Sequence, residues 1–168
     1  MKQIILLNGP SSSGKSTLAK TLQKLFKDNN KQYEIVSIDD FMKISTSETI
    51  YEDDVFEISL DMCHATTKLL EKADGVIVDH VVTSERIYKQ FLNMAKPYTL
   101  LTVHVTCPLK VLLQREKTRG NRCLGSAKNS YDYLYPKDGY DLTIDTNSLS
   151  QEECGLKVYE SAMSFYNN

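Results

Sequence analysis

The most informative absences in this chain of 168 residues concern cysteine pairs, net charge and long apolar runs. The four cysteines include no CxxC pair, which excludes a zinc knuckle or a dithiol redox motif and favours a reducing compartment. The formal net charge is −2, so no overall basic field attracts nucleic acid or a membrane surface. No apolar run is long enough to cross a bilayer, and the first one breaks too early to form a signal peptide. We therefore expect a cytoplasmic protein with neither nucleic acid nor membrane among its partners.

Repeats and low-complexity tracts are also missing, and the length predicts a single domain over residues 1–168. Short β-branched or aliphatic runs alternate with amphipathic stretches. The expected strands are residues 4–7, 33–38, 76–78, 100–105 and 142–144, and the expected helices are 15–27, 58–72, 84–94, 109–119 and 150–165. Apolar runs without polar alternation are typical of a parallel sheet that is covered on both faces. Right-handed crossovers are expected to connect its strands. The predicted fold class is α/β, with three layers (α/β/α) around a five-stranded parallel sheet.

Two segments fit neither pattern and are long for ordinary connections. Residues 41–57, which include "STSETIYEDD", are polar and poorly periodic; residues 119–139 are rich in glycine, lysine and tyrosine. Both follow elements whose ends should face a ligand. They are either surface loops or a substrate flap and a lid, and statistics on long loops favour the functional interpretation.

The first apolar run ends in "NGPSSSGKST", which contains the pattern GxxxxGK[ST] in full. A predicted strand precedes the pattern and a predicted helix follows it, as a phosphate-binding loop requires; the alternative is a glycine-serine turn that matches by chance. Glycines permit close approaches that a Cβ would block, and the positive end of the following helix favours phosphate. The residues predicted to bind a nucleoside triphosphate are Gly9, Pro10, Ser11, Ser12, Ser13, Gly14, Lys15, Ser16 and Thr17.

Two of these side chains have roles that follow from phosphoryl-transfer chemistry. Lys15 is expected to reach the β- and γ-phosphates, and the Ser16 hydroxyl to take one Mg²⁺ position. Asp79 ends the apolar run in "GVIVDHV" and is the expected acidic partner for Mg²⁺, often through water; the alternative is an aspartate that favours a turn. His80 is interpreted as an ordinary polar neighbour rather than a ligand.

The sequence "VSIDDF" places two carboxylates at the end of the second expected strand. In open α/β sheets that edge is where ligands bind. A carboxylate there can accept the proton of an attacking hydroxyl or help to hold Mg²⁺. We assign Asp39 to the chemistry and leave Asp40 undecided between capping a helical turn and supporting the metal.

Three arginines in "REKTRGNR" lie at the end of a predicted helix and just beyond it. Arg115 and Arg119 are four positions apart and can share a helix face, and Arg122 follows the glycine break. Guanidinium groups can bind phosphate oxygens bidentately or stack on an adenine ring. Cations that merely favour a helix dipole are the alternative, which explains one arginine better than three.

With these residues assembled, the chain resembles the chloramphenicol phosphotransferase-like group of P-loop kinases along nearly its whole length. "IILLNGPSSSGKST" resembles the family's phosphate loop, "SIDDF" its strand-end aspartate and "VIVD" its second acidic strand. "REKTRGNRCLGSAK" resembles the family's lid and "YDLTIDTNSLSQEEC" its closing segment. The lysine loop is common to many proteins, whereas the lid and the closing segment together are much more specific.

The resemblance implies a fold like that of nucleoside monophosphate kinases, with ATP and Mg²⁺ as cofactors and a small-molecule hydroxyl as the phosphate acceptor. It implies that Asp39 is the general base and that Thr146, just past the last strand, lies against the adenine. The chain differs from the family pattern at Asn121, Asn129 and 134–135, in a region that would contact the acceptor. The acceptor's identity and the oligomeric state therefore stay open.

Two other classes of function compete with a kinase. A nucleotide-dependent regulatory NTPase or switch would need a sensor motif, and neither one nor a GTP-specific "NKxD" stands out. A nucleotide-binding domain without catalysis would be expected to lack the Asp39 carboxylate, which is present. The leading prediction is an ATP- and Mg²⁺-dependent kinase in which Lys15, Asp39, Arg115, Arg119 and Arg122 carry the reaction.

Overall fold

The structure is a computed structural model that describes residues 1–42, 51–120 and 123–167. Its strands are β1 (Gln3–Asn8), β2 (Tyr33–Ser37), β3 (Gly75–His80), β4 (Thr99–Thr106) and β5 (Leu142–Asp145). Its helices are α1 (Lys15–Asp28), α2 (Glu52–Leu70), α3 (Glu85–Ala95), α4 (Leu109–Arg119), α5 (Ser126–Tyr133) and α6 (Gln151–Asn167), with a 3₁₀ helix η1 (Ile38–Asp40).

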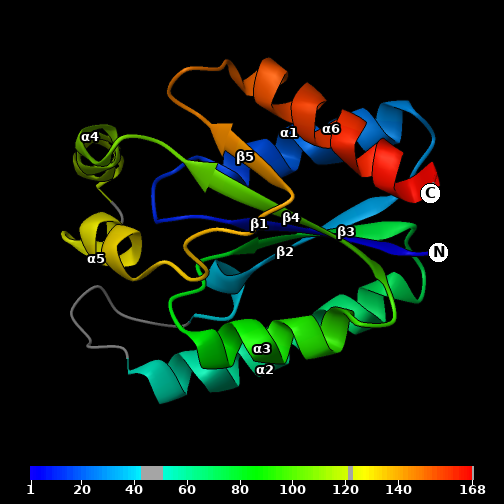
Figure 1. Ribbon diagram of the computed structural model, residues 1–168, viewed down its shortest axis with the longest axis horizontal. Coiled ribbons are helices and arrows are strands. Elements are labelled where there is room, and N and C mark those ends of the chain that lie inside the picture. The colour runs from blue at the N-terminus through cyan, green and yellow to red at the C-terminus, as the bar shows by residue number, and fades with distance from the viewer. Residues whose placement is uncertain (43–50, 121–122, 168) are drawn as a thin grey trace.

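The strands form one parallel sheet in the order β2-β3-β1-β4-β5, which confirms the predicted α/β class and five-stranded sheet. Helices α1 and α6 cover one face, α2 and α3 cover the other, and α4 and α5 lie beyond the carboxyl ends of the strands (Figure 1). Strand β1 is central, so the loop that follows it emerges in the middle of that edge. Ligands bind at this edge of open parallel sheets.

Alternate residues of β1 face the two cores. Ile5 and Leu7 belong to the core shared with α1 and α6, whereas Ile4 and Leu6 belong to the core shared with α2 and α3. All four side chains are fully buried. Burial on both faces explains why this strand is a continuous apolar run rather than an alternating pattern. It also holds the start of the glycine-rich loop rigidly.

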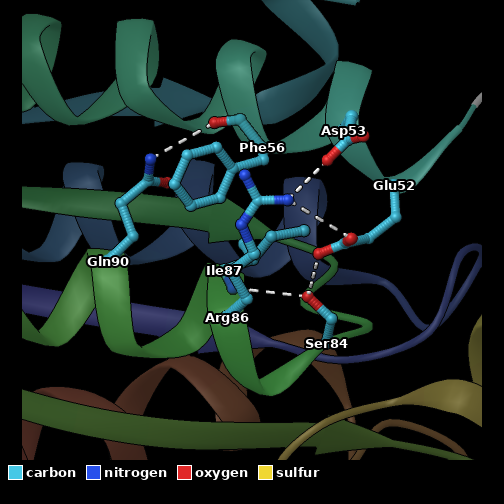
Figure 2. A network of polar contacts seen from close by, with 7 residues as sticks. All are labelled: Glu52, Asp53, Phe56, Ser84, Arg86, Ile87 and Gln90. Carbon is cyan, nitrogen blue, oxygen red and sulfur yellow. Dashed lines mark hydrogen bonds and ion pairs between the residues drawn. The ribbon is translucent and has the colours of Figure 1, made fainter.

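Helix α2 begins at Glu52, six residues earlier than the sequence predicted, so the end of the expected flap is helical. The three acidic residues in its first turn interact favourably with the helix dipole. Arg86 of α3 pairs with Glu52 and Asp53 of this turn, and its guanidinium lies 3.8 Å from the centroid of the Phe56 ring (Figure 2). Contacts with α3 thus stabilise the first turn of α2, whose sequence shows no helical spacing of apolar residues. Residues 43–50 of the expected flap lie outside the described residues.

Helix α5 lies inside the segment 119–139, where the sequence predicted a lid, or else a surface loop, and no helix. Its buried side chains are Ala127 and Ser130, too few to produce an apolar period. The predicted capping box of α6 is present: Ser150 N donates to Glu153 at 2.7 Å, and Glu153 N donates to Ser150 Oγ at 3.2 Å. In the described part of the chain, none of the helices has the length and hydropathy of a membrane span.

Candidate active site

The loop between β1 and α1 depends on glycine at two positions. A Cβ on Gly9 would lie 2.0 Å from the carbonyl oxygen of Val105 in β4, so only glycine lets the strands approach there. Gly14 has φ +96° and is the N-cap of α1, where it provides no side-chain cap. The first N–H groups of α1 are therefore not capped by their own N-cap residue, which is the arrangement that binds phosphate at a helix N-terminus.

The first two residues of α1, Lys15 and Ser16, make polar contacts near the carboxyl ends of the strands. Lys15 is only 6% exposed, and its ammonium donates to the carbonyl of Pro10 at 2.9 Å. Ser16 Oγ donates to Asp79 Oδ2 at 2.7 Å, across from α1 to the end of β3. A hydroxyl and a carboxylate oxygen are ligands that Mg²⁺ prefers, so this pair fits a magnesium site.

Asp39 lies in η1, directly after β2, and lines the same cavity as Lys15 and Asp79. The cap of this short helix is Ser37, whose Oγ accepts from Asp39 N at 3.4 Å. Asp40 is exposed and is not among the residues that line the cavity. Of the two carboxylates in "IDD", the structure brings only Asp39 to the cavity.

His80 is the last residue of β3 and follows Asp79. Its side chain is fully buried and faces α2. Its Nδ1 accepts from Val81 N at 2.8 Å, so Nε2 carries the proton that faces Ser59 Oγ at 3.2 Å. Burial, reinforced by the positive charge of Lys15 and opposed by Asp39, lowers the pKa of His80 from 6.5 to about 3. His80 is therefore a neutral residue that ties the strand end to α2.

Arg115 of α4 binds the outer side of the glycine-rich loop. Its guanidinium donates to Thr146 Oγ1 at 2.9 Å and to the Thr146 carbonyl at 3.1 Å, with longer contacts of 3.4 and 3.5 Å to the carbonyls of Ser13 and Ser12. Thr146 Oγ1 in turn donates to the Ser13 carbonyl at 2.6 Å. Arg115 thus joins the chain after β5 to the loop, a role that its sequence position did not indicate.

Two cavities meet at this point. The larger has a volume of about 560 Å³ and includes Lys15, Asp39, Asp79 and Arg119 in its lining. The second, about 270 Å³, is bounded by the start of α1, by Thr146 and by the start of α6. The residues that line both are Ser12, Gly14, Thr17 and Arg115. A ligand that extends from one cavity to the other would cross the start of α1.

Most of the residues predicted from the sequence come together here. The larger cavity is lined by Ser11, Ser12, Gly14, Lys15, Ser16, Thr17, Asp39, Asp79, Arg115 and Arg119, and the second by Thr146. Gly9, Pro10 and Ser13 shape the loop without lining either cavity. Arg122 lies outside the described residues.

Several residues that shape the site were not predicted from the sequence, apart from Asn129, which belongs to the region expected to contact the acceptor. Ser126, Asn129 and Ser130 of α5 line the larger cavity, because the segment that contains them is helical. The buried Asn8 at the end of β1 donates to the Tyr135 carbonyl at 2.9 Å and to Tyr140 Oη at 2.8 Å. No local pattern marks these long-range contacts; the only signal was a polar residue at the end of a buried strand.

The architecture is that of P-loop kinases. The APS kinase CysC from Mycobacterium tuberculosis, in complex with AMPPNP and APS, is similar with a TM-score of 0.78 and 16% identity over 99% of this chain and 98% of that one. Shikimate kinase from Acinetobacter baumannii, in complex with shikimate, has a TM-score of 0.67 and 18% identity over 98% and 94%. The crystal structure of APE1195 has a TM-score of 0.78 and 18% identity over 97% and 96%.

Comparison of the sequence with protein-family models identifies the family of this chain. Residues 2–163 match the model of the chloramphenicol phosphotransferase-like proteins, so the chain belongs to that family. No curated protein sequence is significantly similar to it. Family and fold together support a nucleotide-dependent phosphotransferase of the kinase type.

Proposed function

We propose that this protein transfers the γ-phosphate of ATP, with Mg²⁺, to a hydroxyl group of a small molecule. The observation that carries the proposal is that Lys15, Asp39 and the Ser16–Asp79 pair all border one cavity, which joins a second cavity at the start of α1. The first provides cationic, basic and metal-binding groups for phosphoryl transfer. The second has room for a purine base beside Thr146.

The glycine-rich loop and its neighbours bind the triphosphate. Lys15 and the N–H groups at the start of α1 bind the β- and γ-phosphates, and Arg119 lies toward the transferring group. Ser16 and Asp79 would hold Mg²⁺, which neutralises charge on the phosphate oxygens when bound. Arg115 holds Thr146 in a fixed position relative to the glycine-rich loop, so that the base and the phosphates are positioned together.

Asp39 acts on the acceptor. Its carboxylate orients the acceptor hydroxyl and takes its proton as the acceptor oxygen bonds to the γ-phosphorus and the bond to the β–γ bridging oxygen breaks, which releases ADP. Four apolar side chains line the larger cavity together with Asp39: Ile38, Met42, Val55 and Val81. This lining suits an acceptor with an apolar body. Asn129, a position that differs from the family pattern, lines the same cavity and supports an acceptor other than chloramphenicol.

The experiment is a screen for acceptor-dependent ADP release. The purified chain is incubated with ATP–Mg²⁺ and a panel of hydroxylated metabolites and antibiotics, chloramphenicol included, and ADP and phosphorylated products are measured. A kinase releases ADP in step with one phosphorylated compound. ATP hydrolysis at one rate whatever the added compound would favour the regulatory NTPase and overturn the proposal.

A further inference from the structure

Helix α5 borders the larger cavity but does not cap its own N-terminus. Its N-cap residue, Gly125, has φ +96° and provides no side-chain hydrogen bond. The helix has eight residues, of which only Ala127 and Ser130 are buried, so little apolar burial holds it in place. An isolated helix of this length is unstable in water. Other parts of the molecule must therefore fix α5 where it lies.

Glu116 of α4 supplies the missing cap. Its side chain is buried, with the residue only 3% exposed, and both carboxylate oxygens accept from the start of α5. Oε2 accepts from Gly125 N at 3.1 Å and Oε1 from Ala127 N at 2.8 Å. A negative charge at a helix N-terminus is also favoured by the dipole. A buried carboxylate held by two N–H groups is a strong, directional link between α4 and α5.

One turn further along α5, Ser130 contacts the phosphate loop. Its Oγ accepts from Ser11 N at 2.9 Å and lies 2.7 Å from the carbonyl of Ser126, to which it donates. The backbone of the loop is thus hydrogen-bonded directly to α5. Ser126, Asn129 and Ser130 line the larger cavity, and no described residue of α5 lines the second.

We propose that Glu116 is a positioning residue, which caps α5 and so holds it against the phosphate loop through Ser130. The inference rests on the proposed function, because it assigns α5 to the γ-phosphate end of a bound triphosphate. A triphosphate extends one phosphate further into the larger cavity than a diphosphate does, and of the two cavities α5 lines only this one. Loss of the cap therefore weakens binding of the triphosphate much more than binding of the diphosphate. A residue that served general stability alone would alter both affinities by the same factor.

The test compares Glu116→Gln and Ser130→Ala with the wild-type chain, and Glu160→Gln, an exposed position on α6, is the charge-matched control. Hydrogen exchange is measured across residues 126–133 without ligand, and calorimetry measures the affinities for AMPPNP–Mg²⁺ and ADP–Mg²⁺. Glu116→Gln should speed exchange in α5 by roughly tenfold or more, since it weakens two charge-assisted bonds. It should weaken AMPPNP–Mg²⁺ by roughly five- to tenfold and ADP–Mg²⁺ by less than about twofold.

Ser130→Ala keeps the buried carboxylate and should produce the same difference between the two nucleotides, at roughly threefold. Glu160→Gln should change neither measurement. Unchanged exchange in α5, or equal weakening of both nucleotides, in Glu116→Gln would overturn the role of Glu116. A wild-type chain that binds neither nucleotide would instead overturn the proposed function, and the exchange measurement would still test the cap.

Discussion

Replacing Arg115 by lysine tests whether this arginine stabilises the glycine-rich loop. The change keeps the positive charge, but an ammonium group reaches one point where the guanidinium forks across several acceptors. Of the four oxygen contacts, those to Thr146 at 2.9 and 3.1 Å have ordinary hydrogen-bond lengths, and lysine can keep only one of them. A hydrogen bond from a charged group contributes about 1.5–3 kcal/mol, so the expected loss is about 2 kcal/mol.

The assay is thermal unfolding of the ligand-free protein, followed by circular dichroism. In a domain of this size, a loss of 1 kcal/mol lowers Tm by about 2–4 °C, so Arg115→Lys should lower it by about 4–8 °C. Arg86→Lys is the matched control. The Arg86 side chain is 50% exposed in the network between α2 and α3 (Figure 2), where solvent screens its ion pairs and they contribute little to stability. Its Tm should fall by less than about 4 °C.

A double-mutant cycle with Thr146→Val locates the effect. If Arg115 acts through Thr146, the two changes should be non-additive by about 1 kcal/mol, since Thr146→Val removes the hydroxyl that accepts from Arg115. Equal decreases in Tm for the two lysine variants, or strict additivity of Arg115→Lys and Thr146→Val, would refute the reasoning.

Three further predictions concern the reaction and the pH dependence of folding stability. Asp39→Asn is nearly isosteric and cannot take a proton, so acceptor phosphorylation should fall by about 10²- to 10⁴-fold while calorimetry gives near wild-type ATP–Mg²⁺ affinity; undiminished transfer would leave Asp40 as the base to test. Lys15→Ala should abolish ATP binding or turnover with the circular dichroism spectrum unchanged, and wild-type affinity together with wild-type turnover would contradict the loop assignment. His80 has a folded-state pKa of about 3, below its unfolded value of 6.5, so the unfolded chain binds the extra proton between these pH values. Its contribution to stability is therefore complete above pH 6.5 and is lost as pH falls toward 3, at about 1.4 kcal/mol per pH unit. Denaturant titrations should show a shallower acid-side slope for His80→Gln than for the wild type or for His64→Gln, an exposed position; parallel slopes would count against a buried neutral histidine.

The sheet and its order of elements were predictable because the signals are local. Buried parallel strands are continuous apolar runs, and α1, α4 and the α6 capping box follow patterns within a few residues of sequence. The two errors occur where a neighbouring element stabilises the helix. The first turn of α2 is held by Arg86 of α3, and α5 is capped by Glu116 of α4.

By itself, the sequence determined that a glycine-rich loop joins the first strand to a helix, with acidic residues at the ends of two other strands. These features depend on residue type at short spacing, since glycine fits tight backbone and aliphatic runs form buried strands. Only the tertiary structure decided which side chains meet. Asp39 and not Asp40 lines the cavity, Arg115 donates to Thr146 and to the glycine-rich loop, and Glu116 accepts from α5. These contacts depend on how distant segments pack, and side-chain direction at such points has no local period.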